Sequence, residues 1–355
     1  MPKRKSLILA LLIIPTFLFI KLISYFPETV ETYYSNGIYP ITSKLLHFNL
    51  GWIPFSFGDV FYTVISLYAI YWVIKNIKRI YKDTLSWFVD VFSAISLLYL
   101  AFHVLWGFNY YRKPLHENLN LNADYTTEQL IEVTKMLILE SNSLHTKLSK
   151  NDTLKVNFPF NKTFVINNTH IGYDKLKTTY PHLDYSVSSI KNSLFSYPLT
   201  KMGFSGYLNP FTNEAQPNGL IPIYKYPTTC AHEVAHQLGY AAENEANFIG
   251  CLASINHPNN YFNYSGYTFA LRHCLAEIYK RNPDLYMEIA CTINPGIYAN
   301  YREVSDFWDS HKNSSEPVFK ETYSTFLKAN NQSKGIESYS YVVALYVNYF
   351  IERKI

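Results

Sequence analysis

Cysteine is scarce in this chain, which has 4 cysteines among 355 residues. Cys230, Cys251, Cys274 and Cys291 are not spaced as the Cys-x-x-Cys pairs that hold structural zinc, so a cysteine-paired zinc module is excluded. Two interpretations stay open for them, one or two disulfides or buried free thiols.

Charge is also low, with 16% charged residues and a formal net charge of +4. No dense basic stripe occurs outside the flanks of the hydrophobic stretches described below, which argues against a dedicated nucleic-acid binder. The sequence contains no internal repeat, low-complexity tract or long linker.

Hydrophobic residues, in contrast, make up 48% of the chain and aromatic residues 17%. Three apolar stretches are each near the length needed to cross about 30 Å of hydrocarbon: residues 7–26, 57–74 and 88–108. No small-residue cleavage site follows the first stretch, which favours an anchor over a signal peptide. We therefore predict a membrane domain with three transmembrane helices over residues 1–111, with the lipid bilayer as its partner.

Basic residues predict the orientation of this membrane domain. Lys3, Arg4 and Lys5 precede the first stretch, and Lys75, Lys78, Arg79 and Lys82 lie between the second and the third. Such clusters are retained in the cytoplasm, so the N-terminus is expected there and everything after the third stretch outside. The expected location is a bacterial cytoplasmic membrane with residues 112–355 forming one extracytoplasmic domain.

Helices dominate the expected structure of residues 112–355, with a small sheet in an α+β arrangement. Thr126 and Gln129 predict a capping box for a helix over 127–149. Short β-rich pieces at 163–166, 206–214 and 221–224 predict the sheet. Apolar periodicity predicts further helices, listed by residue range: 267–281, 284–292, 300–311, 316–329 and 338–352. A short helix lying in the outer membrane interface is expected within residues 27–56.

The motif that carries chemistry is His232-Glu233-Val234-Ala235-His236. Two histidines four residues apart lie on one face of a helix and can bind one metal ion, while the intervening glutamate can act as a general base. Thr229 is a candidate N-cap for this helix, with the first turn near Cys230, and Gly239 is expected to end it. Cys230 points to another side of that helix and is not taken as a ligand.

A carboxylate for the third ligand position follows within a dozen residues. Glu243 and Glu245 begin a second helical stretch, and a turn at Gly239 would fold it back toward the histidines. The spacing leaves either glutamate open as the ligand of one Zn²⁺ ion.

This region resembles the zincin metallopeptidases, and more closely the gluzincins. Residues 243–247, Glu-Asn-Glu-Ala-Asn, are similar to the Glu-x-x-Ala-Asp segment of membrane-bound gluzincins. The resemblance implies a zincin-like fold, Glu243 as third ligand and Asn247 as support for a ligand histidine, although the family has aspartate at that last position.

Three further segments carry a second resemblance: residues 106–112 (WGFNYYR), residues 206–215 (GYLNPFTNEA), and the histidine motif with residues 243–248. Together they resemble an uncharacterised bacterial membrane family, the domain of unknown function 3810, with a zincin motif. This likeness implies a family and no substrate.

The sequence therefore predicts a membrane-anchored zinc metallopeptidase that acts on peptide or protein, with Glu233 as general base. Glu214 is a candidate substrate-binding residue, and Tyr339 is a candidate for stabilising the oxyanion. Two alternatives stay open: a non-catalytic protein with a structural or binding metal site, and a metal-dependent hydrolase of a non-protein envelope substrate.

Overall fold

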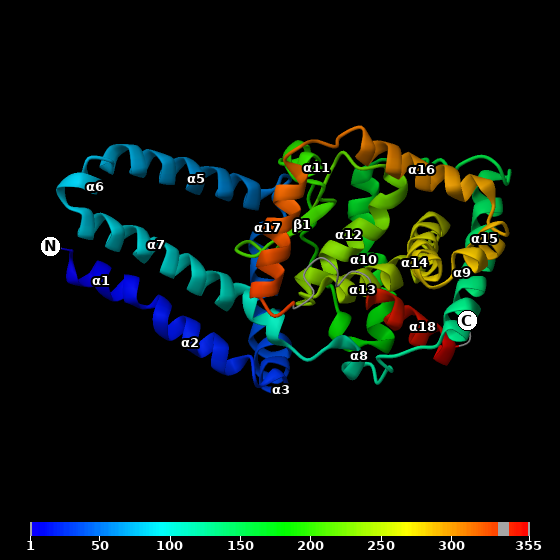
Figure 1. Ribbon diagram of the computed structural model, residues 1–355, viewed down its shortest axis with the longest axis horizontal. Coiled ribbons are helices and arrows are strands. Elements are labelled where there is room, and N and C mark those ends of the chain that lie inside the picture. The colour runs from blue at the N-terminus through cyan, green and yellow to red at the C-terminus, as the bar shows by residue number, and fades with distance from the viewer. Residues whose placement is uncertain (1, 333–340, 354–355) are drawn as a thin grey trace.

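A computed structural model describes residues 2–332 and 341–353 of the chain. Figure 1 shows an elongated molecule with long helices of the N-terminal third at one end and a compact, mostly helical part at the other. A two-stranded sheet is the strand structure of the described residues.

Three stretches of helix are long and apolar enough to cross a membrane, and they indicate membrane association. The first runs over Arg4–Ile23 and consists of α1 (Arg4–Leu11) and α2 (Ile13–Ile23). The second is α5 (Phe57–Asn76) and the third is α7 (Thr84–Leu105), joined through the short α6 (Arg79–Lys82). These stretches agree with the predicted positions to within a few residues.

The segment between the first two spans is helical and packs against the compact part. It comprises α3 (Pro27–Thr29), the π-helix η1 (Val30–Ile38) and α4 (Tyr39–Leu50). The Tyr39 hydroxyl donates a hydrogen bond of 2.7 Å to the carbonyl of Gln237, and Arg112 forms a buried ion pair of 2.6 Å with Glu31. The sequence predicts only a short interfacial helix here. The observed segment is longer and packs against the compact part.

Helices follow the third span. They are η2 (Gly107–Tyr111), α8 (Leu115–Asn118), α9 (Thr127–Ser149), α10 (Lys162–Thr179), η3 (Pro181–Leu183) and α11 (Ser196–Met202). The predicted capping box of Thr126 and Gln129 is present at the start of α9.

The strand predicted at 163–166 is wrong, because those residues lie in the first turn of α10. The Asn161 side chain caps this helix by accepting from the Phe164 N–H, and Val165 and Tyr173 bury its inner face.

The sheet is an antiparallel hairpin of β1 (Gly206–Asn209) and β2 (Glu214–Pro217), with Leu208 opposite Ala215. The chain reverses through Asn213, which has a φ of 54°. The strand predicted at 221–224 is wrong, since that stretch leads into the short 3₁₀ helix η4 (Ile223–Lys225).

The remaining helices form the layers around the motif. They are α12 (Tyr226–Gln237), α13 (Glu243–Ile255), α14 (Asn260–Arg281), α15 (Pro283–Ala290), α16 (Pro295–Asp309), α17 (Glu316–Ala329) and α18 (Val342–Arg353). Their apolar faces pack with α9 and α10 into one main core.

The start of α12 differs from the prediction. The helix begins at Tyr226, with Pro227 in its first turn, where a missing N–H removes no helical hydrogen bond. Thr229 lies inside the helix and donates to the Lys225 carbonyl, so it is not the N-cap. Gly239 ends the helix as expected, in the left-handed region at a φ of 86°.

All four cysteines are free thiols in the structure. Cys230, Cys251 and Cys274 are buried, and Cys291 is exposed. Burial raises the pKa of the Cys251 thiol to about 12, so this side chain is an unreactive part of the core.

Candidate metal centre

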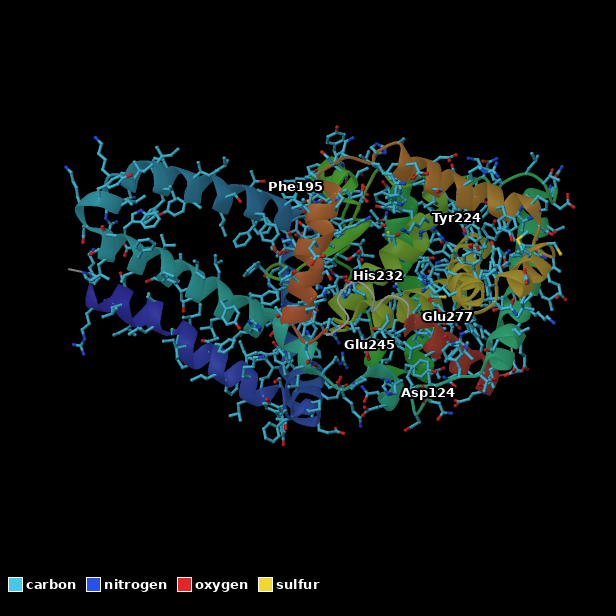
Figure 2. All side chains as sticks on the ribbon, viewed as in Figure 1. Asp124, Phe195, Tyr224, His232, Glu245 and Glu277 are labelled. Atoms are coloured by element: carbon cyan, nitrogen blue, oxygen red, sulfur yellow. The ribbon has the colours of Figure 1, made fainter. Side chains whose placement is uncertain are left out.

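The centre is built on α12, which carries His232, Glu233 and His236 in its last two turns. The imidazole rings of the two histidines have centroids 4.6 Å apart. The ligand atoms of His232, Glu233 and His236 all lie within 4.8 Å of one another. Figure 2 places His232 on the side of the compact part that faces the spans, with Glu277 farther away along the long axis.

A second helix brings a carboxylate to these histidines. The left-handed turn at Gly239 lets α13 fold back against α12, and Gly250 of α13 lies against the backbone of α12 at Ala231 and His232. A Cβ added at Gly250 would lie 2.6 Å from the backbone nitrogen of His232, so glycine is required for this contact.

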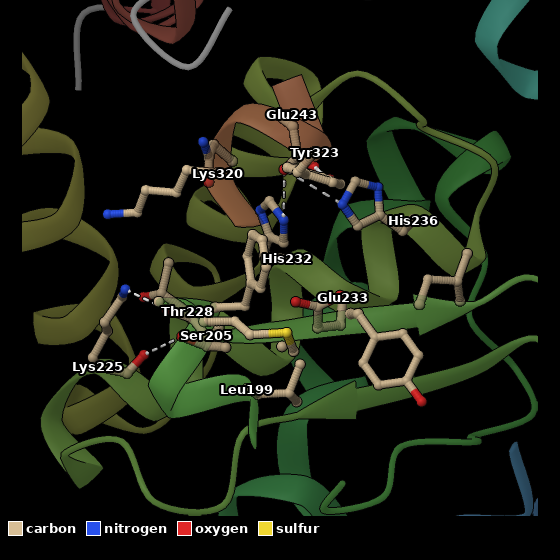
Figure 3. A pocket seen from close by; sticks show the side chains of 18 of the residues that line it. Leu199, Ser205, Lys225, Thr228, His232, Glu233, His236, Glu243, Lys320 and Tyr323 are labelled. Carbon is tan, nitrogen blue, oxygen red and sulfur yellow. Dashed lines mark hydrogen bonds and ion pairs between the residues drawn. The ribbon is translucent and has the colours of Figure 1, made fainter. Parts of the chain in front are cut away.

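Glu243 is the first residue of α13, and its side chain faces both rings (Figure 3). Its Oε2 atom lies 3.2 Å from Nε2 of His232 and 3.6 Å from Nε2 of His236. Two ligand atoms of a tetrahedral zinc ion, each about 2.0–2.1 Å from the metal, are about 3.3 Å apart. The distance from the carboxylate oxygen to each imidazole nitrogen is therefore close to that between two zinc ligands.

Unpaired polar atoms fit the same interpretation. Oε2 of Glu233 is buried and has no hydrogen-bond partner among the described residues, whereas Oε2 of Glu243 faces only the two imidazoles. A buried carboxylate oxygen without a partner is costly unless an ion or water satisfies it. The donor set of two imidazoles and a carboxylate is one that Zn²⁺ prefers, so these residues fit the metal.

The pKa shifts of His236 and Glu243 show that the space between them favours positive charge. Burial lowers the pKa of His236, but the Glu243 carboxylate outweighs it and raises the pKa to about 9. Burial likewise raises the pKa of Glu243, yet the histidines hold it well below its usual range. The space between these groups thus favours a cation, whether proton or metal. Burial raises the pKa of Glu233, and the charges of the two histidines oppose that rise.

Outer contacts orient one of the two histidines. Nδ1 of His236 hydrogen-bonds to the carbonyl of Tyr240 at 2.7 Å, which leaves Nε2 free to face Glu243. Trp106 donates from its indole to the backbone carbonyl of His236 at 3.1 Å. Nδ1 of His232 has no such partner within the described part of the chain.

The other predicted site residues lie at different places. Glu245 turns away from the histidines and accepts a hydrogen bond of 2.7 Å from the backbone of Leu115, so of the two candidate glutamates only Glu243 reaches the histidines. Asn247 lies on the wall of the cavity described below, but its side chain makes no hydrogen bond to either histidine in the described structure. Tyr339 lies outside the described residues.

Glu214 is buried between the hairpin and the start of α5. It lies in β2, is 0% exposed, and forms an ion pair with Lys191 at 2.5 Å. It also accepts from the backbone N–H groups of Phe57 and Gly58 at the start of α5. Both oxygens of this carboxylate thus accept hydrogen bonds within the protein, and the substrate-binding role of Glu214 stays a prediction.

Tyr323 is a residue that the sequence analysis did not find. It comes from α17, and its hydroxyl donates a hydrogen bond of 2.5 Å to Oε1 of Glu243. Its ring packs edge-on against Phe204 at 5.2 Å. Among 32 tyrosines no local pattern marks this one, because its position depends on how α17 crosses the site.

A cavity of about 1550 Å³ opens beside the centre. Its walls include His232, Glu233, His236 and Glu243, so the carboxylates and rings are accessible from it. Pockets for small molecules usually measure about 300–1,000 Å³, so this one can hold a larger molecule.

Comparison with known proteins gives a family. The family model described as protein of unknown function (DUF3810) matches residues 34–347. No curated protein and no solved structure matches this chain.

Proposed function

The chain belongs to the DUF3810 family, whose description states no activity, and we propose from its own residues that it is a membrane-anchored, zinc-dependent metallopeptidase of gluzincin type. The observation that carries the proposal is the approach of Glu243 Oε2 to both imidazole Nε2 atoms, beside a buried Glu233 with a free carboxylate oxygen. A metal site that serves only stability is usually closed by four protein ligands and needs no such neighbour.

The residues divide the chemistry between them. His232, His236 and Glu243 would hold one Zn²⁺ ion, which when bound would polarise a water molecule and the scissile carbonyl. Glu233 would accept the proton from that water and return it to the leaving amine, because its carboxylate lies beside the two histidines with one oxygen free of hydrogen bonds among the described residues.

Tyr323 is the neighbour best placed to assist. Its hydroxyl holds Oε1 of Glu243, which fixes the carboxylate so that Oε2 faces the imidazoles.

We also propose where the site operates. The basic residues before the first span and around α6 favour the cytoplasm, which would place the centre on the extracytoplasmic side of a bacterial inner membrane. The substrate would then be a peptide or protein at that membrane surface.

Replacing the general base tests the proposal. Glu233→Gln is expected to keep one zinc per chain and to lose peptide hydrolysis by about 100- to 10,000-fold, since general base catalysis contributes that much. Zinc is measured by metal analysis of the detergent-purified full chain, and hydrolysis with a mixed peptide library read by mass spectrometry. Glu132→Gln, on an exposed position of α9, is the matched control. Full hydrolysis in Glu233→Gln would exclude the assigned base, and a wild type without zinc would exclude the metal centre.

A further inference from the structure

One wall of the cavity is made by the spans. Tyr62 of α5 and Ile95, Leu98 and Phe102 of α7 line it, although these helices belong to the part of the chain that is apolar enough to lie in a membrane. Figure 1 shows α5 and α7 running apart from each other toward the compact part. The cavity therefore continues from the candidate metal centre to side chains at the level of the spans.

The opposite wall carries positive charge. Lys225 and Arg272 line the cavity, and neither takes part in an ion pair with any described residue. The Lys225 ammonium donates to the Ser205 hydroxyl at 2.8 Å and lies 5.8 Å from the Trp308 ring. Burial and then the Arg272 charge lower the pKa of Lys225 to about 8. The Glu233 carboxylate acts on Lys225 in the opposite direction but forms no ion pair with it, so an anion that bridges Lys225 and Arg272 would be stabilised.

The candidate metal centre lies between the two walls. Figure 3 shows Lys225 on one side of His232, with Glu233 and His236 on the other. A molecule that spans the cavity would thus place its middle at the centre, an apolar portion at α5 and α7, and a negative group at Lys225 and Arg272.

We infer that the substrate is an anionic amphiphile from the bilayer: a hydrocarbon chain between α5 and α7, a scissile amide at the centre, and an anionic group at Lys225 and Arg272. This substrate class rests on the proposed hydrolytic function. A substrate of this class would pass its hydrocarbon chain from the bilayer into the cavity, between the second and third spans.

A flexible acyl chain suits this path better than a transmembrane helix does. Backbone amides in the bilayer are satisfied only by internal hydrogen bonds, so a helical substrate hides the bond to be cut. An acyl chain has no such groups and can bend into the cavity while its amide reaches the centre. The cationic wall adds a requirement for negative charge that an apolar helix would not meet.

Binding is tested without catalysis in the Glu233→Gln full chain, reconstituted with zinc in nanodiscs. The probe is N-palmitoyl-glycyl-aspartate with a diazirine in the acyl chain, compared with its N-acetyl form and its uncharged asparagine-amide form. We expect photolabelling of cavity-lining residues of α7 and at least about tenfold weaker capture of both comparison probes.

Matched variants locate the two ends of the probe. Arg272→Gln should weaken capture of the aspartate probe by about tenfold, whereas Lys280→Gln, exposed on the same helix, should leave it unchanged. Leu98→Trp should block the acyl chain, whereas Leu97→Trp should not, because both leucines are 44% exposed but only Leu98 lines the cavity.

Each outcome bears on one of the two proposals. Equal capture of the charged and uncharged probes, equal capture of the palmitoyl and acetyl probes, or displacement by an uncharged transmembrane peptide would overturn the amphiphile. Capture without any hydrolysis by the zinc-loaded wild type would instead count against the peptidase and leave the binding site standing. Hydrolysis of acetyl peptides without capture of the palmitoyl probe would overturn the amphiphilic substrate and leave the peptidase standing.

Discussion

At the scale of the residue, the choice between Glu243 and Glu245 depends on helix geometry. Residues two apart on a helix point in nearly opposite directions, so only one of the two can face the histidines. Glu243 does so from the first position of α13, where the helix dipole also favours a negative charge. The spacing could name both candidates but could not choose between them, because the angle at which α13 folds back is a tertiary property.

Tyr323 offers a test at this scale. Tyr323→Phe removes the hydrogen bond to Glu243 and keeps the ring that packs on Phe204, so the fold should persist. We expect about tenfold weaker zinc binding and about 100-fold slower hydrolysis. Competition with a zinc chelator measures the first, and peptide hydrolysis the second. Tyr197→Phe, at an exposed position, is the control, and a Tyr323→Phe variant with unchanged zinc affinity would contradict the assigned contact.

His257 predicts how stability depends on pH. His257 is 5% exposed, and its ring stacks on Phe262 at 3.8 Å, accepts the Asn259 N–H and hydrogen-bonds to the Asn168 carbonyl. Burial lowers its pKa to about 4, against 6.5 in the unfolded chain. The folded state therefore binds fewer protons, and the stabilisation is complete above pH 6.5 and is lost as the pH falls toward 4.

The expected loss from His257 is on the order of 2 kcal/mol between pH 7 and pH 4. Thermal unfolding of the full chain in detergent, followed across this range, measures it. His257→Gln should unfold at a lower temperature at pH 7 but with a flatter acid profile. Parallel profiles for the two proteins would show that His257 is not the titrating group.

At the scale of the element, contacts decide what local propensity cannot. The β-branched residues at 163–166 favour a strand, yet the Asn161 cap and the buried face of α10 make them helical. Conversely, the helix over 127–149 is readily predicted because its capping box and its apolar periodicity agree. The prediction fails where the two signals differ and tertiary packing is the stronger.

The contact between α12 and α13 predicts that a Gly→Ala substitution in a helix lowers the stability of the protein, where it usually raises it. Gly→Ala in an exposed helix usually stabilises by about 1 kcal/mol. Gly250→Ala should instead destabilise by about 1–3 kcal/mol, because the new methyl group meets the backbone of His232 and forces the helices apart. It should also weaken zinc binding by moving Glu243.

Denaturant unfolding and zinc content measure both effects of Gly250→Ala. Gly219→Ala is the control, since its added Cβ would meet only side-chain atoms of Asn192 and Ser196, at 3.3 Å, and no backbone atom of another helix. If Gly250→Ala were as stable as the wild type, the close approach of the two helices would be wrong.

At the scale of the whole molecule, the N-terminal third is packed into the rest of the chain. Arg112 joins the segment after the third span to Glu31 of η1 and also donates to the carbonyl of Gly239, next to the motif helix. Asp59, at the start of α5, is fully buried and accepts from the Leu194 N–H at 2.7 Å. The division at residues 111 and 112 stays a prediction, but these contacts tie both sides of it together.

Native Cys291 tests the proposed orientation. It is the exposed cysteine, whereas the other three are buried. A membrane-impermeant maleimide added to intact spheroplasts should label Cys291 if the compact part is extracytoplasmic. In a Cys291→Ser background, Tyr81→Cys in α6 should be labelled only after lysis, because Tyr81 is 89% exposed but is expected in the cytoplasm. The opposite labelling pattern would reverse the topology.

By itself, the sequence determined the elements whose causes are local: three apolar spans, the capped α9, the pair of histidines four residues apart, and the stop at Gly239. These follow from side-chain length, hydrophobicity and backbone freedom within a few residues. Only the tertiary structure decided that Glu243 faces the histidines, that Tyr323 joins it, and that Glu214 is locked in a joint with α5. Those positions depend on how helices far apart in the chain pack, and the pairing of distant surfaces has no local signal.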